Sequence, residues 1–147
     1  MSKSDVRIVT SINGFEMLQQ FIESCINKNA DDSSVKNLLK DCFQHKNHKQ
    51  CYLGWNEYSN WDGFGDKNSE FIMEGLRFLE ENNYSYRYYR LGEDKEDYDE
   101  HHFDSEKEGE QDLEYPNIIR QFDDRYIVDI LYAQKSRDLQ EKEDLEI

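Results

Sequence analysis

The densest cluster of ionisable side chains lies between Glu93 and Asp112, where eleven acidic residues and two lysines give a net charge of −9. Like charges at this density repel one another, so the segment is expected to need a cation or a basic partner to become ordered. DNA carries one negative charge per ~1.7 Å of helix axis, and proteins that neutralise it release counterions. Protein carboxylates at similar density can be attracted by the same lysines and arginines of a basic groove that bind the phosphates. The pattern therefore favours a polyanionic surface that occupies a site built for nucleic acid.

The candidate partner-binding residues fall into two groups. Aromatic anchors with an acidic rim lie in the turn-rich loop 60–68, and the members of this first group are Trp61, Asp62, Phe64 and Asp66. The second group opens the acidic stretch and would supply electrostatic attraction; its members are Glu93, Asp94, Glu96, Asp97, Asp99 and Glu100. A structural interpretation of the aromatic residues stays open, in which Trp55 packs in the core and Trp61 pins the loop.

The acidic stretch also permits a metal-binding interpretation. Carboxylates at alternate positions near residues 94–99 suit a hard cation such as Ca²⁺, although the run lacks the internal glycine and ligand order of an EF-hand. His101 and His102 would add ligands for a metal-dependent enzyme, but adjacent side chains on a helix point about 100° apart and chelate poorly. We expect no metal and no other cofactor, with a metal-dependent enzyme or calcium-binding module using residues 93–104 as the alternative.

Motifs with established catalytic chemistry do not occur in the sequence, which lacks G-x-G-x-x-G, a P-loop, G-x-S-x-G and H-E-x-x-H. Three cysteines, Cys25, Cys42 and Cys51, are odd in number and form no C-x-x-C pair. This argues against a disulfide framework or a zinc ribbon. A binding protein is therefore favoured over an enzyme, and a structural partner protein with a merely solubilising acidic loop is a further alternative.

Composition narrows the partner class. The 147 residues include 33 acidic and 18 basic side chains, so the formal net charge is −15. Direct binding to nucleic acid or to an anionic membrane is disfavoured, because both would repel the chain. Aromatic residues reach 14%, which distinguishes the protein from aromatic-poor disordered acidic chains. The first 50 residues carry a net charge of +1, so all of the acidic excess follows them, and the expected partner is a basic protein surface.

The elements that must position these residues are predicted from periodicity and turn signals. Helices are expected at 15–27, capped by Asn13, at about 34–42, capped by Ser33 or Ser34, and at 69–82. Strands are expected at 6–12, 50–58, 84–91, 118–122 and 126–133, the last two joined by a turn at Asp123-Asp124. The order predicts an α+β fold with one mixed or antiparallel sheet of four to five strands and two or three helices on one face. The closest named pattern is the ferredoxin-like split arrangement.

Domain organisation and location follow from length and hydropathy. We expect a single α+β domain over residues 1–135 and a charged tail over 136–147 that forms at most a frayed helix. The N-terminus lacks the apolar stretch of a signal peptide, and no run approaches the ~18 apolar residues of a membrane span. A cytoplasmic protein is therefore expected.

One segment resembles a known group of proteins. From Trp55 to Asp94 the chain has a Trp-containing strand and loop with Trp61-Asp62, then the helix 69–82, then the run Arg90-Leu91-Gly92-Glu93-Asp94. This order is similar to that of small phage- and prophage-type proteins of unassigned function. The resemblance implies a mobile-element protein, a setting in which small acidic proteins that block host nucleic-acid enzymes recur.

Overall fold

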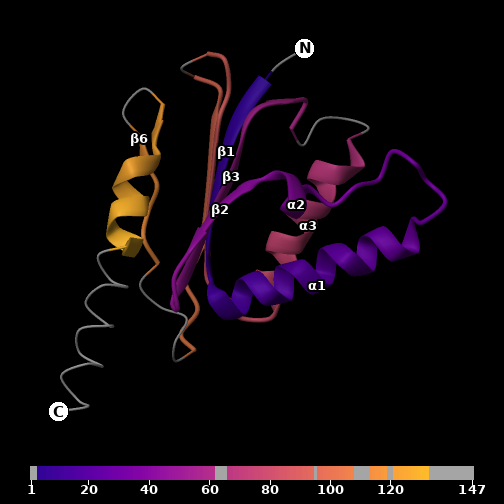
Figure 1. The fold of residues 1–147 in the computed structure, drawn as a ribbon, viewed down its shortest axis with the longest axis horizontal. Helices are drawn as coiled ribbons and strands as arrows, with labels where there is room; N and C mark the ends of the chain where they lie inside the picture. Colours follow the sequence, from indigo (N-terminus) through magenta and orange to yellow (C-terminus); the bar gives the residue numbers. More distant parts are fainter. Residues whose placement is uncertain (1–2, 62–65, 95, 108–112, 119–120, 133–147) are drawn as a thin grey trace.

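The structure is a computed structural model that describes residues 3–61, 66–94, 96–107, 113–118 and 121–132. The predicted α+β class is confirmed: one antiparallel sheet of five strands carries three helices on one face (Figure 1). The predicted charged tail at 136–147 lies outside the described residues.

The described elements follow one another along the chain with these bounds: β1 (Lys3–Ser11), α1 (Ile12–Lys28), α2 (Leu38–Asp41), β2 (Phe43–Lys46), β3 (Gln50–Ser59), α3 (Lys67–Glu81), β4 (Tyr86–Leu91), β5 (Tyr98–Phe103), β6 (Asn117–Ile118) and β7 (Phe122–Asp123). Residues 124–132 are helical. Strands β6 and β7 form a separate two-stranded sheet.

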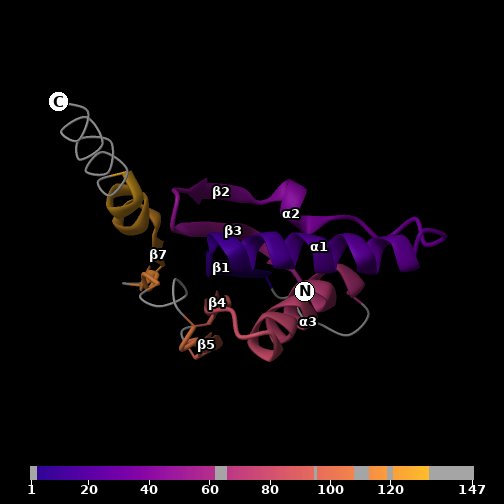
Figure 2. The same ribbon diagram turned by 90° about the horizontal axis from the view of Figure 1, so that it is seen from below.

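The five strands lie in the order β2-β3-β1-β4-β5, and each neighbouring pair is antiparallel. Figure 2 shows this order, with α1, α2 and α3 together on one side. Strands β1 and β2 are therefore parallel with β3 between them, and β3 and β4 are parallel with β1 between them. Two interleaved split β-α-β units of this kind define the ferredoxin-like pattern, to which β5 adds an edge strand.

Alternation along the central strand β1 sends side chains into two separate cores. Val6 and Ile8 are fully buried beneath the helices, together with Leu18 of α1 and Leu76 of α3. Val9 points to the opposite face and packs with Tyr52. That face is covered by Leu113 and by the helical residues 124–132, which contribute Ile127 and Leu131 and lie across the sheet from α1 (Figure 1).

Several local predictions were wrong for identifiable reasons. Ser11, not Asn13, caps α1, because its Oγ accepts from the Gly14 N–H at 2.9 Å. The second helix does not begin at Ser33 or Ser34. Ser34 instead donates from its N–H and Oγ to the Asp32 carboxylate, and the short α2 is capped by Asn37.

Two further predictions were wrong about whole elements: a helix was expected to be a strand, and a strand was expected to be unordered. Residues 118–122 and 126–133 were expected to form a strand hairpin, but the chain becomes helical at Asp124, and Ile127 and Leu131 face the sheet one turn apart. The acidic stretch was expected to stay unordered without a cation or partner, but it contains β5. Arginines of β4 supply the counter-charge inside the fold, because Arg90 pairs with Asp97 and Asp99, and Arg87 with Asp104.

The second core is organised around Arg7, whose side chain is 3% exposed. Its Nε and Nη2 donate to the two carboxylate oxygens of Asp124, at 2.8 and 3.1 Å, and Nη1 donates to the backbone carbonyls of Val6 and Trp55. The guanidinium lies between the rings of Phe43 and Phe122, at 4.6 and 4.8 Å from their centroids. Strand β1 is thereby tied directly to the segment that covers its face.

Replacing Arg7 tests this anchor. Arg7→Met should lower the free energy of unfolding by about 3 kcal/mol, the lower end of the range for a broken buried ion pair, because Asp124 stays partly hydrated. Urea unfolding measures the change. Lys36→Met is the control, since Lys36 pairs with Asp41 at 3.8 Å on the surface and such pairs contribute less than about 1 kcal/mol. Equal losses in both variants would contradict the anchoring role.

A second prediction concerns the space that Arg7 needs. A Cβ on Gly54 would lie 2.5 Å from the Val6 carbonyl oxygen and 2.7 Å from the Arg7 Cδ. Gly54→Ala should therefore destabilise the protein by about 2 kcal/mol through overpacking, measured by thermal unfolding. An unchanged melting temperature would show that β1 and β3 can separate locally at no cost.

Candidate protein-binding surface

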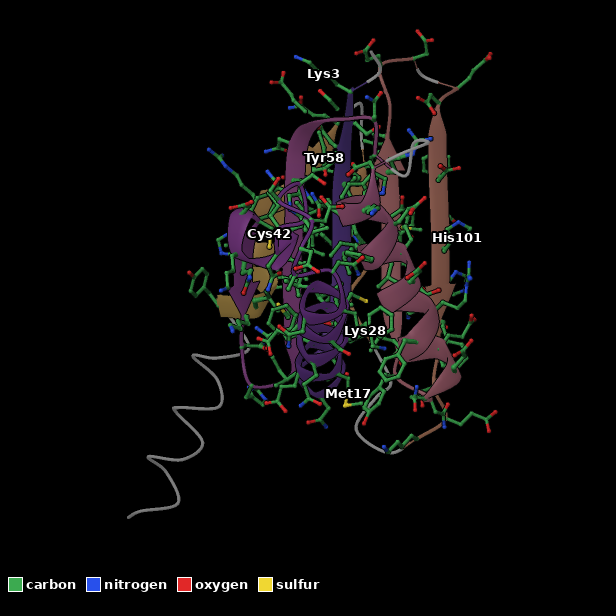
Figure 3. The ribbon with its side chains drawn as sticks, turned by 90° about the vertical axis from the view of Figure 1, so that its right-hand side faces the viewer. Lys3, Met17, Lys28, Cys42, Tyr58 and His101 are labelled. Atoms are coloured by element: carbon green, nitrogen blue, oxygen red, sulfur yellow. The ribbon has the colours of Figure 1, made fainter. Side chains whose placement is uncertain are left out.

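A groove of about 500 Å³ lies between α3 and the outer strands of the sheet. In Figure 3, where the helix layer faces the viewer, His101 lies on the outermost strand with α3 beside it. Met73 and Leu76 contribute apolar surface, and the polar lining residues are Glu70, Glu74, Arg77, Glu80, Tyr86 and His101. We call this the acidic groove.

The helical period of α3 explains why the glutamates line the groove. Ile72, Leu76 and Leu79 form the buried stripe that packs on the sheet. Glu70 and Glu74 are one turn apart on the exposed face, where they are neighbours on the helix surface. Burial of one stripe therefore forces the carboxylates of the other stripe toward solvent and toward the edge of the sheet.

These glutamates differ from Asp97, Asp99 and Glu100 of the β4–β5 hairpin in one respect. Among the described residues, the side-chain carboxylates of Glu70, Glu74 and Glu80 have no hydrogen-bond or ion-pair partner. Arg77 is the basic residue of the groove lining. The acidic groove therefore carries negative charge that the fold itself does not use.

The acidic residues singled out from the sequence are largely engaged within the fold. Arg90 donates to Asp97 at 2.5 Å and to Asp99 at 2.8 Å, and its side chain is 14% exposed. Hydrogen bonding from Arg90 lowers the pKa of the Asp97 carboxyl, and partial burial opposes this only in part. These two carboxylates hold the β4–β5 hairpin and are not free to meet a partner.

The remaining members of that group lie around the hairpin turn. Glu93 accepts from the backbone N–H of Lys3 at 3.0 Å. Glu100 accepts from the Tyr98 hydroxyl, a bond that raises the pKa of Tyr98 to about 12. Asp94 and Glu96 are exposed at the turn itself, so they extend the negative surface beyond the acidic groove.

The aromatic group of the loop does not form an exposed anchor. Trp61 is 6% exposed, and its indole N–H donates to the Tyr88 hydroxyl at 2.9 Å. Trp61 therefore packs in the core, as its structural interpretation expects, and its ring is not presented as an exposed anchor. Asp66 accepts from Ser69 Oγ and from the Tyr58 hydroxyl at the start of α3. Asp62 and Phe64 lie outside the described residues.

Two carboxylates of the metal-binding interpretation, Asp97 and Asp99, pair instead with Arg90. Among the described residues, no three His, Cys, Asp or Glu side chains gather closely enough to hold a metal ion. His101 and His102 alternate across β5, and the His101 ring stacks on Tyr88 at 5.6 Å. The three cysteines are free, and burial raises the pKa of Cys51 to about 12, which makes that thiol a poor nucleophile.

In the part of the chain that the structure describes, no helix combines the length and the apolar character needed to cross a membrane.

The glutamates of α3 are the candidate site residues that sequence reasoning missed. The available signal was the exposed face of the predicted helix 69–82, where acidic residues recur at helical spacing opposite the buried stripe. The charge run after Glu93 is much denser and gives the stronger sequence signal, although part of that run neutralises arginines inside the fold.

The Arg90 pairing predicts a specific titration. The Asp97 carboxyl should titrate below the ~3.9 of an unperturbed aspartate, so its contribution to stability is present above that pH and is lost as the pH falls through the lower, folded value. NMR titration of the carboxyl carbons measures the midpoint. Arg90→Gln should move the Asp97 midpoint upward, whereas that of Asp32, which is lowered by Ser34 and Lys67, should stay. An unchanged titration midpoint of Asp97 in the Arg90→Gln variant would contradict the pairing.

Comparison with known proteins gives no match, whether to a protein-family model, to a curated protein or to a solved structure. The resemblance of residues 55–94 to small phage-type proteins therefore stays a prediction from the residues alone.

Proposed function

We propose that this protein is a non-enzymatic inhibitor that mimics nucleic acid and blocks the basic groove of a nucleic-acid-acting protein. A phage antagonist of a host defence nuclease and an immunity protein for a nuclease toxin are the two settings that fit such a protein. In both, the partner is a basic protein surface in the cytoplasm, and the inhibitor needs no cofactor.

The observation that carries the proposal is the set of unneutralised carboxylates on α3. Glu70, Glu74 and Glu80 line the acidic groove without partners among the described residues. A buried or paired carboxylate has already given up its hydration to the fold, whereas these three can exchange water for a lysine or arginine of a partner. Because they lie on a well-packed helix, their carboxylates are held at defined positions relative to one another, which favours specific contacts with a partner.

The charge surrounding the acidic groove supports the same interpretation. Residues 66–107 contain thirteen acidic and six basic side chains. Two of the six, Arg87 and Arg90, are buried or nearly so and are paired with aspartates inside the fold. Setting aside these two arginines and their three aspartates leaves ten acidic and four basic side chains, so the remaining surface is still strongly negative. A field of one sign over such an area accelerates encounter with a basic groove and weakens as salt is added.

The test is displacement of DNA. A panel of purified nucleases and DNA-binding proteins is loaded with a fluorescent DNA duplex, and the protein is titrated into each complex over a salt series. We expect displacement from a member with a basic groove, with an apparent affinity that falls steeply as salt increases. An affinity that does not respond to salt would contradict the mimic.

Matched variants then locate the surface. The triple variant Glu70→Gln, Glu74→Gln, Glu80→Gln should weaken displacement about tenfold, or ~1.4 kcal/mol, because each partly exposed charge pair contributes ~0.2–1 kcal/mol. The control removes three exposed acids elsewhere, with Glu16→Gln, Glu23→Gln and Asp31→Asn. Equal losses in the two variants would show that net charge alone acts and that the acidic groove is not the contact surface.

A further inference from the structure

Strand β5 leaves one edge of its backbone open. It ends the five-stranded sheet, and within the described residues it pairs only with β4. The Gly92 N–H donates to the Asp97 carbonyl at 2.7 Å, while the Asp97 N–H donates to Asp94 within the turn. The single Gly92–Asp97 bond still sets which residues of β5 face β4. Because hydrogen-bonded pairs alternate along an antiparallel ladder, the register directs the backbone groups of Tyr98, Glu100 and His102 away from β4.

The acidic groove runs beside this open edge. His101 belongs to β5 and lines the groove, and its ring stacks on Tyr88, which lies in the core beneath the helices. A strand added about 4.8 Å beyond β5 would continue the same face. Every second side chain of that strand would point to the α3 side, where Glu70, Glu74 and Glu80 lie.

A second copy of the chain is a poor occupant of this edge. Antiparallel pairing of two β5 strands centred on Asp99 or Glu100 would place that acid opposite its own copy, and like charges in cross-strand positions are destabilising. Pairing β5 of one copy with β2 of another would use only a short strand, because β2 has four residues and β5 has six. The acidic residues of β5 instead favour a basic occupant, because opposite charges attract across paired strands.

We propose that the open edge of β5 receives an extended, lysine- or arginine-bearing segment of the partner protein as a sixth strand. This inference rests on the proposed function and names how the partner is held. Main-chain hydrogen bonds to Tyr98, Glu100 and His102 supply affinity, and alternate basic side chains of the segment meet the glutamates of α3.

Hydrogen exchange tests the backbone contacts without altering the protein. The probe is a peptide of alternating lysine and threonine, about eight residues long to match a strand, followed by NMR. We expect the amides of Tyr98, Glu100 and His102 to gain about tenfold protection when the peptide binds. The amides of Asp99, His101 and Phe103 point to β4 and should be protected already. A peptide of alternating glutamate and threonine is the control and should not bind.

Two variants at one position separate backbone from charge. Glu100→Pro removes an outward N–H at an edge position where proline is tolerated, and it should weaken peptide binding about tenfold. Glu100→Gln removes the same carboxylate and keeps the N–H, so it should weaken binding only about twofold. Melting curves show whether both variants fold, and the exchange measurement decides the question if the proline variant does not.

The outcomes separate this inference from the proposed function. Protection of the three outward amides, with binding weakened more by proline than by glutamine, supports strand addition. Binding that is lost in the α3 triple variant without any gain in amide protection overturns strand addition and leaves the acidic surface as the contact. A peptide that does not bind at all also overturns it, and DNA displacement then decides the proposed function on its own.

Discussion

The contact of Arg7 with Asp124 is the interaction on which the two-sided packing of the sheet depends. Arg7 lies on the central strand, where a fully charged side chain is buried at 3% exposure. Burial of an unpaired guanidinium would cost several kcal/mol, so the site requires a carboxylate that arrives from elsewhere in the chain. Asp124 supplies it, and the Tyr52 hydroxyl also donates to that carboxylate. Burial would raise the pKa of Asp124, but these hydrogen bonds outweigh it and the pKa is lowered.

This requirement explains why the chain places acids where it does. Arg7, Arg87 and Arg90 are buried or nearly so on neighbouring strands, and each is met by an aspartate: Asp124, Asp104, or the pair Asp97 and Asp99. Part of the net charge of −15 is therefore the counterpart of arginines inside the fold. The carboxylates of α3 do not belong to this set, and that difference makes them the better candidates for a partner.

The sequence predicted the elements whose stability is local or whose core face is periodic. Residues 69–82 and 50–58 were placed within two residues of α3 and β3, because their apolar spacing reports the buried stripe directly. Strands β2 and β5 were missed because polar edge strands owe their conformation to pairing with β3 and β4, which no local pattern records. The helix at 124–132 was misassigned since its β-branched residues favour a strand, and only contact with Val9 and Tyr52 reveals the four-residue spacing.

The same topology determines what is left for a partner. One face of the sheet is covered by α1, α2 and α3, and the other by Leu113 and the helical residues 124–132. A partner that bound either face would have to displace a packed core or break the contact of Arg7 with Asp124. Binding at an edge costs neither, because within the described residues β5 pairs with β4 alone and its outward backbone groups have no strand partner. Since α3 lies beside that edge, with three glutamates whose carboxylates have no partner among the described residues, the charge and the open backbone lie at one place, and a basic extended segment satisfies both.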